Sequence, residues 1–247
     1  MMHRMILLIG IGISIVSASV DVEILGKEKA RVFKAIKYDF LQKTNNHFGN
    51  SGDKRTKVIR FFEADLKKLI ADTSDPEEQA KLEAISAHWT KLKKLFDTPV
   101  TDATIEKIFK EEFHEGLRTK KKILELTQTQ LKDDKNKTLF YLNNLRAISQ
   151  KFAITYLVKT VEPTGATSEE TQKQLAITLE KFRTALDHLH KELKTEEQKA
   201  MLQELEKIYL YFDFLSQSRQ FTPTLIIHKS DEMLTLAKKL VKSYHAN

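Results

Sequence analysis

An internal repeat is the feature of this sequence that most constrains its fold. A shift of 120 residues lays one set of apolar positions on another without a gap, and both sets have helical spacing. Agreement over such a long stretch indicates that one helical module was duplicated. The two sets are Leu66, Leu69, Leu82, Ile85, Trp89, Leu92 and Leu95, and Leu186, Leu189, Leu202, Leu205, Tyr209, Phe212 and Leu215. We therefore expect function to reside in what differs between the copies or in the seam between them.

The apolar-periodic stretches are eight in number, and turn-forming residues separate them. All four prolines (Pro76, Pro99, Pro163 and Pro223) lie between such stretches, where a helix can start or stop. The sequence predicts an all-α fold of two tandem up-down four-helix bundles with antiparallel helices. The bundles are expected at 19–132 and 138–247, with a polar break at 133–137. A continuous helix joining 107–132 to 138–161 is the alternative at the seam.

The N-terminus has the composition of a secretory signal peptide. Residues 1–4 form a short basic region, residues 5–16 are almost entirely apolar, and small residues allow cleavage after Ala18. An uncleaved membrane anchor is the competing interpretation, but Asp21 interrupts the apolar run before the about 20 residues that a span needs. We therefore predict that residues 1–18 are a cleaved signal. The mature protein is expected to be periplasmic or secreted, with no transmembrane span.

Motifs of enzymatic chemistry are absent from the sequence. There is no cysteine, which excludes disulfides, thiolate metal sites and cysteine nucleophiles. There is also no Gly-x-Ser-x-Gly, no His-Glu-x-x-His and no glycine-rich phosphate loop. We expect a protein without catalytic residues and without a cofactor.

The formal net charge is +7, and the basic residues are interleaved with acidic ones. The densest basic run is Lys120-Lys121-Lys122. We interpret it as a solvated helix face rather than a nucleic-acid site, and expect no nucleic-acid partner.

Two segments have the spacing of metal ligands on a helix. Glu111-x-x-His114 and Asp187-x-x-His190 each place a carboxylate and an imidazole on one helix face. Di-iron bundles need two such motifs and two further carboxylates, and no matching carboxylate pair is evident on the other helices. We therefore predict no metal site, and a metal-dependent bundle enzyme is the least favoured alternative.

The second copy contains the string Asn144-Leu-Arg146-Ala-Ile-Ser149-Gln150-Lys151. This string resembles the Arg-x-x-Ser-Gln-(Arg/Lys) signature of the N-terminal sensory domain of type IV pili methyl-accepting chemotaxis transducers. That PilJ-type family is related to the periplasmic domain of nitrate/nitrite sensor kinases. The resemblance covers about 138–244. The first copy resembles a degenerate version, in which a shift of 112 residues places Lys34 and Lys37 opposite Arg146 and Ser149.

The resemblance implies an extracytoplasmic sensory domain whose helix carries an anion-binding arginine. In the nitrate-sensing relatives this arginine receives a small anion at a subunit interface, and Arg146 is the matching position. A guanidinium presents paired planar donors that suit a planar oxyanion. Ser149, one turn away, adds a hydroxyl donor, and Gln150 is expected to hydrogen-bond across the bundle. The predicted ligand-binding residues are Arg146, Ser149 and Gln150.

The function that follows is signal transduction by an exported, non-enzymatic ligand-binding bundle protein. We expect it to bind a small oxyanion and to present it to a membrane-bound receptor, or to self-associate. The alternative is a structural or protein-interaction module of the cell envelope. In that case the aromatic end of one helix, with Tyr209, Tyr211, Phe212 and Phe214, would contact the partner.

Overall fold

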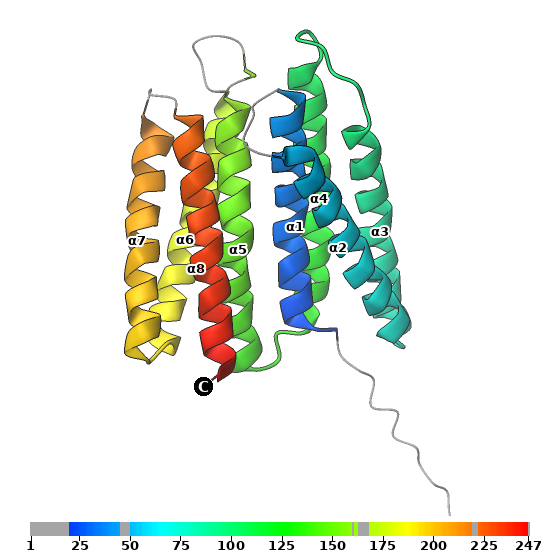
Figure 1. The fold of residues 1–247 in the computed structure, drawn as a ribbon. Coiled ribbons are helices and arrows are strands. Elements are labelled where there is room, and N and C mark those ends of the chain that lie inside the picture. The colour runs from blue at the N-terminus through cyan, green and yellow to red at the C-terminus, as the bar shows by residue number, and fades with distance from the viewer. Residues whose placement is uncertain (1–19, 45–49, 160, 163–167, 219–221, 247) are drawn as a thin grey trace, which may run out of the picture.

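The computed structural model describes residues 20–44, 50–159, 161–162, 168–218 and 222–246 (Figure 1). The predicted signal peptide at 1–18 lies outside these ranges. The described part of the chain contains eight helices and no strand, which confirms the all-α prediction. The helices are α1 (Val22–Lys43), α2 (Ser51–Asp72), α3 (Pro76–Phe96), α4 (Ile105–Thr129), α5 (Asp134–Val158), α6 (Glu169–Glu192), α7 (Glu196–Gln217) and α8 (Pro223–Ala246).

Local sequence explains where several helices begin. The Asp21 and Asp75 carboxylates accept hydrogen bonds from the free backbone N–H groups that open α1 and α3. Pro76 occupies the first turn of α3, where a missing N–H costs nothing. Thr195 and Gln198 form a capping box at the start of α7.

A turn separates α4 from α5, so the continuous helix considered for the seam is wrong. α4 ends at Thr129, and α5 begins at Asp134, where the Asp133 carboxylate accepts from the Asn136 N–H at 2.6 Å. The polar run 133–137 therefore caps and opens α5, which starts earlier than the expected boundary at 138. The chain reverses direction at this turn (Figure 1).

The helices form two four-helix bundles, α1–α4 and α5–α8 (Figure 1). In the first bundle, α1 packs on α2 and α4, and α3 packs on α2 and α4. In the second, α5 packs on α6 and α8, and α7 packs on α6 and α8. Corresponding helices of the two copies therefore have corresponding neighbours.

The repeated apolar positions form the two hydrophobic cores. All fourteen residues matched by the 120-residue shift are buried except Leu95 and Tyr209, which are partly buried. Phe62 stacks on Trp89 in the first core at 3.9 Å between ring centroids, and Phe152 stacks on Phe212 in the second at 4.1 Å. Packing of this kind stabilises each bundle without disulfides.

The bundles meet along α1 and α5, which lie side by side and run in the same direction (Figure 1). This seam is closely packed, because the residues Ile154, Leu157 and Val158 of α5 belong to the core of the first bundle. Lys37 of α1, fully buried, forms an ion pair with Asp231 of α8 at 2.7 Å. Since α1 and α5 have neighbours on several sides, polar side chains on them lie in surroundings of low dielectric.

Candidate functional site

Two depressions flank the α1–α5 seam. One, which we call the Arg146 groove, lies between α1, α2, α5 and α8 and has a volume of about 610 Å³. The other, which we call the Lys151 cavity, lies between α1, α4, α5 and α6 and has a volume of about 230 Å³. Both are built by residues that are far apart in the sequence.

The Arg146 groove is lined by many cations and few anions. Among its described lining residues Asp65 is the one carboxylate, and it pairs with Arg31 at 2.6 Å. Arg31 also contacts Glu28, and the Asp65 carboxylate compensates its charge. The basic lining residues are Lys27, Arg31, Lys34, Lys54, Lys57, Arg146 and Lys238.

Arg146, Lys34 and Lys238 form no ion pair with any described residue of the chain. The Arg146 guanidinium donates to the neutral Asn143 Oδ1 at 2.9 Å. Burial, with Lys238 as the next cause, lowers the pKa of Lys34 to about 8. Burial and then Arg146 lower the pKa of Lys238. Lys238 is therefore repelled by both Lys34 and Arg146, while Asp231 acts against the shifts of Lys34 and Lys238 and Glu23 acts against that of Arg146. Without an ion pair in contact with these three cations, the groove favours a bound anion.

Ser149 and Gln150 are placed differently from Arg146. Both are fully buried, and neither is among the described residues that line the groove. Ser149 Oγ donates to the Arg146 backbone carbonyl at 2.8 Å, and Gln150 Nε2 donates to Ser149 Oγ at 3.1 Å. The hydrogen bond that we expected Gln150 to make across the bundle is thus made within α5. The structure brings Arg146 alone of the three predicted residues to the groove.

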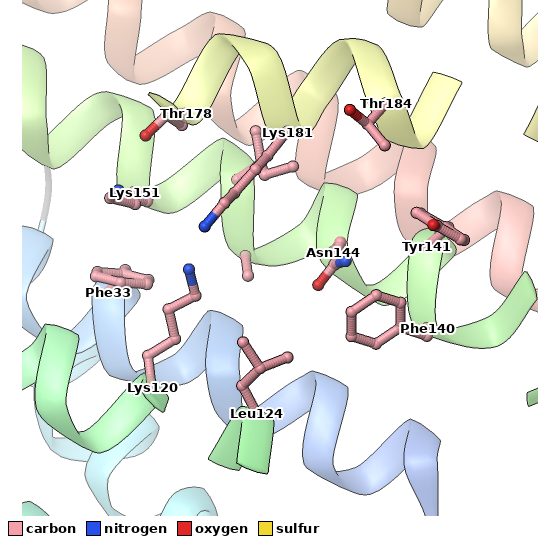
Figure 2. A pocket seen from close by; sticks show the side chains of 12 residues that line it. Phe33, Lys120, Leu124, Phe140, Tyr141, Asn144, Lys151, Thr178, Lys181 and Thr184 are labelled. Atoms are coloured by element: carbon pink, nitrogen blue, oxygen red, sulfur yellow. The ribbon is translucent and has the colours of Figure 1, made fainter. Parts of the chain in front are cut away.

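The Lys151 cavity is lined by lysines from three helices, and a fourth lysine lies beside it. Lys120 of α4 and Lys181 of α6 point toward one another from opposite walls (Figure 2). Lys151 of α5 is buried and donates to Gln174 Oε1 at 2.8 Å. Lys29 of α1, also buried, lies beside the cavity and donates to Asn144 Oδ1 at 2.9 Å. None of the described residues that line the cavity is acidic.

Burial and neighbouring ammonium groups lower the pKa values of Lys29, Lys151 and Lys120. Burial, followed by the charges of Lys120 and Lys181, lowers the pKa of Lys29 to about 7. The same causes in the same order lower the pKa of Lys151 to about 7, and Glu170 opposes them. Burial and then Lys181 lower the pKa of Lys120 to about 8. Each shift disfavours the charged form, as expected where cations share an apolar site.

The two sites are equivalent positions in the two copies. A shift of 117 residues lays the groove residues Ala30 and Lys34 on the cavity residues Ala147 and Lys151, and it lays Lys29 on Arg146. The buried positions of α1 and α5 coincide at a shift of 117 residues and not at the expected shift of 112. Lys34 therefore corresponds to Lys151, and the expected correspondence of Lys34 with Arg146 is wrong. Each copy therefore has one depression at the equivalent place, and the two linings differ.

Sequence reasoning missed the lysines of the cavity. The run Lys120–Lys122 was interpreted as a solvated face, and Lys121 is indeed exposed while Lys122 pairs with Glu125 at 2.9 Å. Lys120, however, lines the cavity. A signal for these lysines was present in the sequence: Lys29 and Lys151 each stand among apolar positions on the buried face of a helix.

The other sequence candidates lie elsewhere. Glu111 and His114 are exposed on α4, and His190 hydrogen-bonds to Glu206 at 2.8 Å. Within the described ranges, no group of three or more His, Asp or Glu side chains could hold a metal ion. None of the described helices is long and apolar enough to cross a membrane.

The aromatic end of α7 faces two ways. Phe212 is buried in the second core, whereas Phe214 is 65% exposed. Leu210, one turn before Phe214, is 64% exposed. The two exposed side chains form a small apolar surface on α7.

Comparisons of the chain with models of protein families, with curated proteins and with solved structures gave no match.

Proposed function

We propose that this chain is an exported, non-enzymatic ligand-binding protein of the sensory class, and that it binds a small oxyanion in the Arg146 groove. One observation carries the proposal. Arg146, Lys34 and Lys238, from three different helices, share a groove and form no ion pair with a described residue.

The physical reason is the free energy of uncompensated charge. Cations that are partly removed from water and lie near like charges are destabilised, and an anion between them relieves both effects. The guanidinium of Arg146 offers paired N–H donors, and the two ammonium groups add donors that adapt to the ligand's shape. The groove, at about 610 Å³, has room for an oxyanion together with bridging waters.

The resemblance of 144–151 to the PilJ-type signature supports the same residue. An arginine at the position of Arg146 is the anion receptor in the nitrate-sensing relatives. The apolar surface of Leu210 and Phe214 gives the bundle a place to contact a receptor or a second copy.

Calorimetry and thermal denaturation with nitrate, nitrite, sulfate and phosphate, at constant ionic strength against chloride, test the proposal. A specific oxyanion at about 100 times its Kd should stabilise the fold by about 2.7 kcal/mol, which corresponds to a rise in Tm of about 5–10 °C for a chain of this size. Arg146→Ala should reduce the affinity at least about tenfold, since a charge-assisted hydrogen bond contributes about 1.5–3 kcal/mol.

Arg183→Ala is the matched control, because Arg183 is an exposed arginine on α6 outside the groove. Its affinity should equal that of the unmodified protein. Oxyanion binding that persists unchanged in Arg146→Ala would contradict the groove assignment. If no oxyanion shifts Tm more than chloride does, the alternative of a structural or protein-interaction module is favoured.

A further inference from the structure

The Lys151 cavity differs from the Arg146 groove in that its walls are mostly apolar. Lys120, Lys151 and Lys181 gather toward one end, where Phe33 also lies, and Phe140 and Tyr141 lie toward the other, with Leu124 between them (Figure 2). Ala147 and Ile148 of α5 complete the apolar lining. The cavity therefore has a cationic end and an aromatic end, and the Lys29 ammonium lies over the Phe140 ring at the aromatic end, 4.5 Å from its centroid.

The cationic end has no counter-charge in contact with it. Neither Lys120 nor Lys181 has a hydrogen bond or ion pair within the described part of the chain. Lys29 and Lys151 donate to the neutral amide oxygens of Asn144 and Gln174. An amide oxygen accepts a hydrogen bond but brings no negative charge, so these lysines have no anion in contact to stabilise their protonated form.

One carboxylate acts on this cluster from outside the lining. Glu170 of α6 accepts from Gln174 Nε2 at 2.8 Å, and Gln174 in turn accepts from Lys151. Glu170 is exposed and reaches Lys151 only through this amide. It leaves the charges of Lys120 and Lys181 uncompensated.

The size of the cavity limits the ligand. Its volume is about 230 Å³. An apolar cavity of about 150 Å³ holds a benzene molecule, so this one accommodates a single ring and a carboxylate. An inorganic oxyanion would leave the apolar end facing water, and a neutral hydrocarbon would leave the lysines unpaired.

We propose that the Lys151 cavity binds a small amphipathic carboxylate of the size of a monocyclic aromatic acid. Its carboxylate lies between the ammonium groups of Lys120 and Lys181, and its ring packs against Phe140, Leu124 and Ile148. The site does not rest on the function proposed above, because it shares no lining residue with the Arg146 groove.

Isothermal titration calorimetry of the full chain with benzoate and phenylacetate tests this assignment. Acetate, which lacks the ring, and benzyl alcohol, which lacks the charge, are the comparison probes. We expect at least one aromatic acid to bind at least about tenfold more tightly than either comparison probe, because only it fills both ends of the cavity. Lys120→Met and Lys181→Met should each weaken that binding at least about tenfold, while keeping the aliphatic stem.

Lys173→Met is the control, since Lys173 is an exposed lysine on α6 that does not line the cavity. It should bind like the unmodified chain. Because Lys181 is itself exposed, its substitution keeps the test available if Lys120→Met fails to fold. The assignment is overturned if neither aromatic acid binds at millimolar concentration, if acetate binds equally well, or if Lys181→Met leaves the affinity unchanged. Arg146→Ala should leave the binding of the aromatic acid intact, which separates this site from the groove.

Discussion

At the scale of single residues, buried ionisable groups set much of the energetics. Glu28 is 1% exposed and pairs with Arg31. Burial raises the pKa of Glu28 to about 9, Arg31 opposes the rise, and Asp65 adds to it. The folded protein therefore holds a proton that the unfolded chain has released. The free energy of unfolding falls on this account as the pH rises from the ordinary value of 4.5 toward about 9.

We predict that Glu28→Gln stabilises the protein at pH 8. Glutamine has the shape of the protonated acid and can still accept from Arg31, but it never ionises. A gain of about 1 kcal/mol or more corresponds to a rise in Tm of about 2–4 °C for a chain of this size. At pH 4.5 the two proteins should melt within about a degree of each other.

Differential scanning calorimetry at the two pH values measures this difference. Glu180→Gln, at an exposed position of α6, is the control, and it should leave the Tm unchanged at both pH 8 and pH 4.5. A variant that melts lower than the unmodified protein at pH 8 would mean that Glu28 is ionised and stabilised by Arg31.

At the scale of helices, close approach depends on two glycines. A Cβ atom on Gly26 of α1 would come under 3.0 Å from the Asn143 Cβ of α5. On Gly116 of α4 it would come equally close to Ile36 Cδ1, which is the far end of a flexible side chain. Gly116 therefore allows a close approach of α4 to α1.

We predict that Gly26→Ala destabilises the protein more than Gly116→Ala. Asn143 Cβ is fixed to the backbone of α5, so α1 and α5 must move apart, at a cost of about 1–3 kcal/mol. The end of Ile36 can turn away from its preferred rotamer by about 30°, which costs about 0.5–1.5 kcal/mol, and alanine's higher helix propensity offsets part of this cost. Urea denaturation gives both free energies of unfolding, and the reverse order would refute the packing of the seam described above.

At the scale of the whole molecule, two bundles joined at a cationic seam should have an unusual dependence of stability on pH. The pKa values of Lys29 and Lys151 are lowered to about 7, and those of Lys34 and Lys120 to about 8. Between these values and the ordinary 10.5, the unfolded chain binds more protons than the folded one. Stability contributed by these groups therefore rises with pH. The charged groups that face them are Lys37, Lys54, Lys181, Lys238, Glu170 and Asp231.

We predict that Tm, measured at low ionic strength in the Glu28→Gln background, increases from pH 7 to pH 9.5. A saturating anionic ligand should flatten this increase, because it holds the lysines protonated in the folded state. Melting curves with and without benzoate or a bound oxyanion test both statements. Burial also raises the pKa of Glu112, which lowers stability as the pH rises, so the measurement is repeated with Glu112→Gln added. A Tm that still falls steadily over this range would show that the lysines at the seam are compensated.

The sequence by itself determined the class of fold and the doubling of the bundle. These follow from local rules, since apolar periodicity defines each helix and residues such as Asp75, Thr195 and Gln198 begin it. The resemblance around Arg146 also selected a residue that lines the groove. The sequence could not show that Ser149 and Gln150 lie outside the groove. Their spacing on the helix does not reveal that other helices surround α5 and bury both side chains.

Only the tertiary structure decided which helices meet at the seam and which lysines face one another there. Lys29, Lys120, Lys151 and Lys181 come from four helices, and each alone is an ordinary basic residue. The physical reason is that the state of a charge depends on its surroundings, and those are set by neighbours distant in sequence. Packing α1 against α5 converts scattered lysines into two cationic sites.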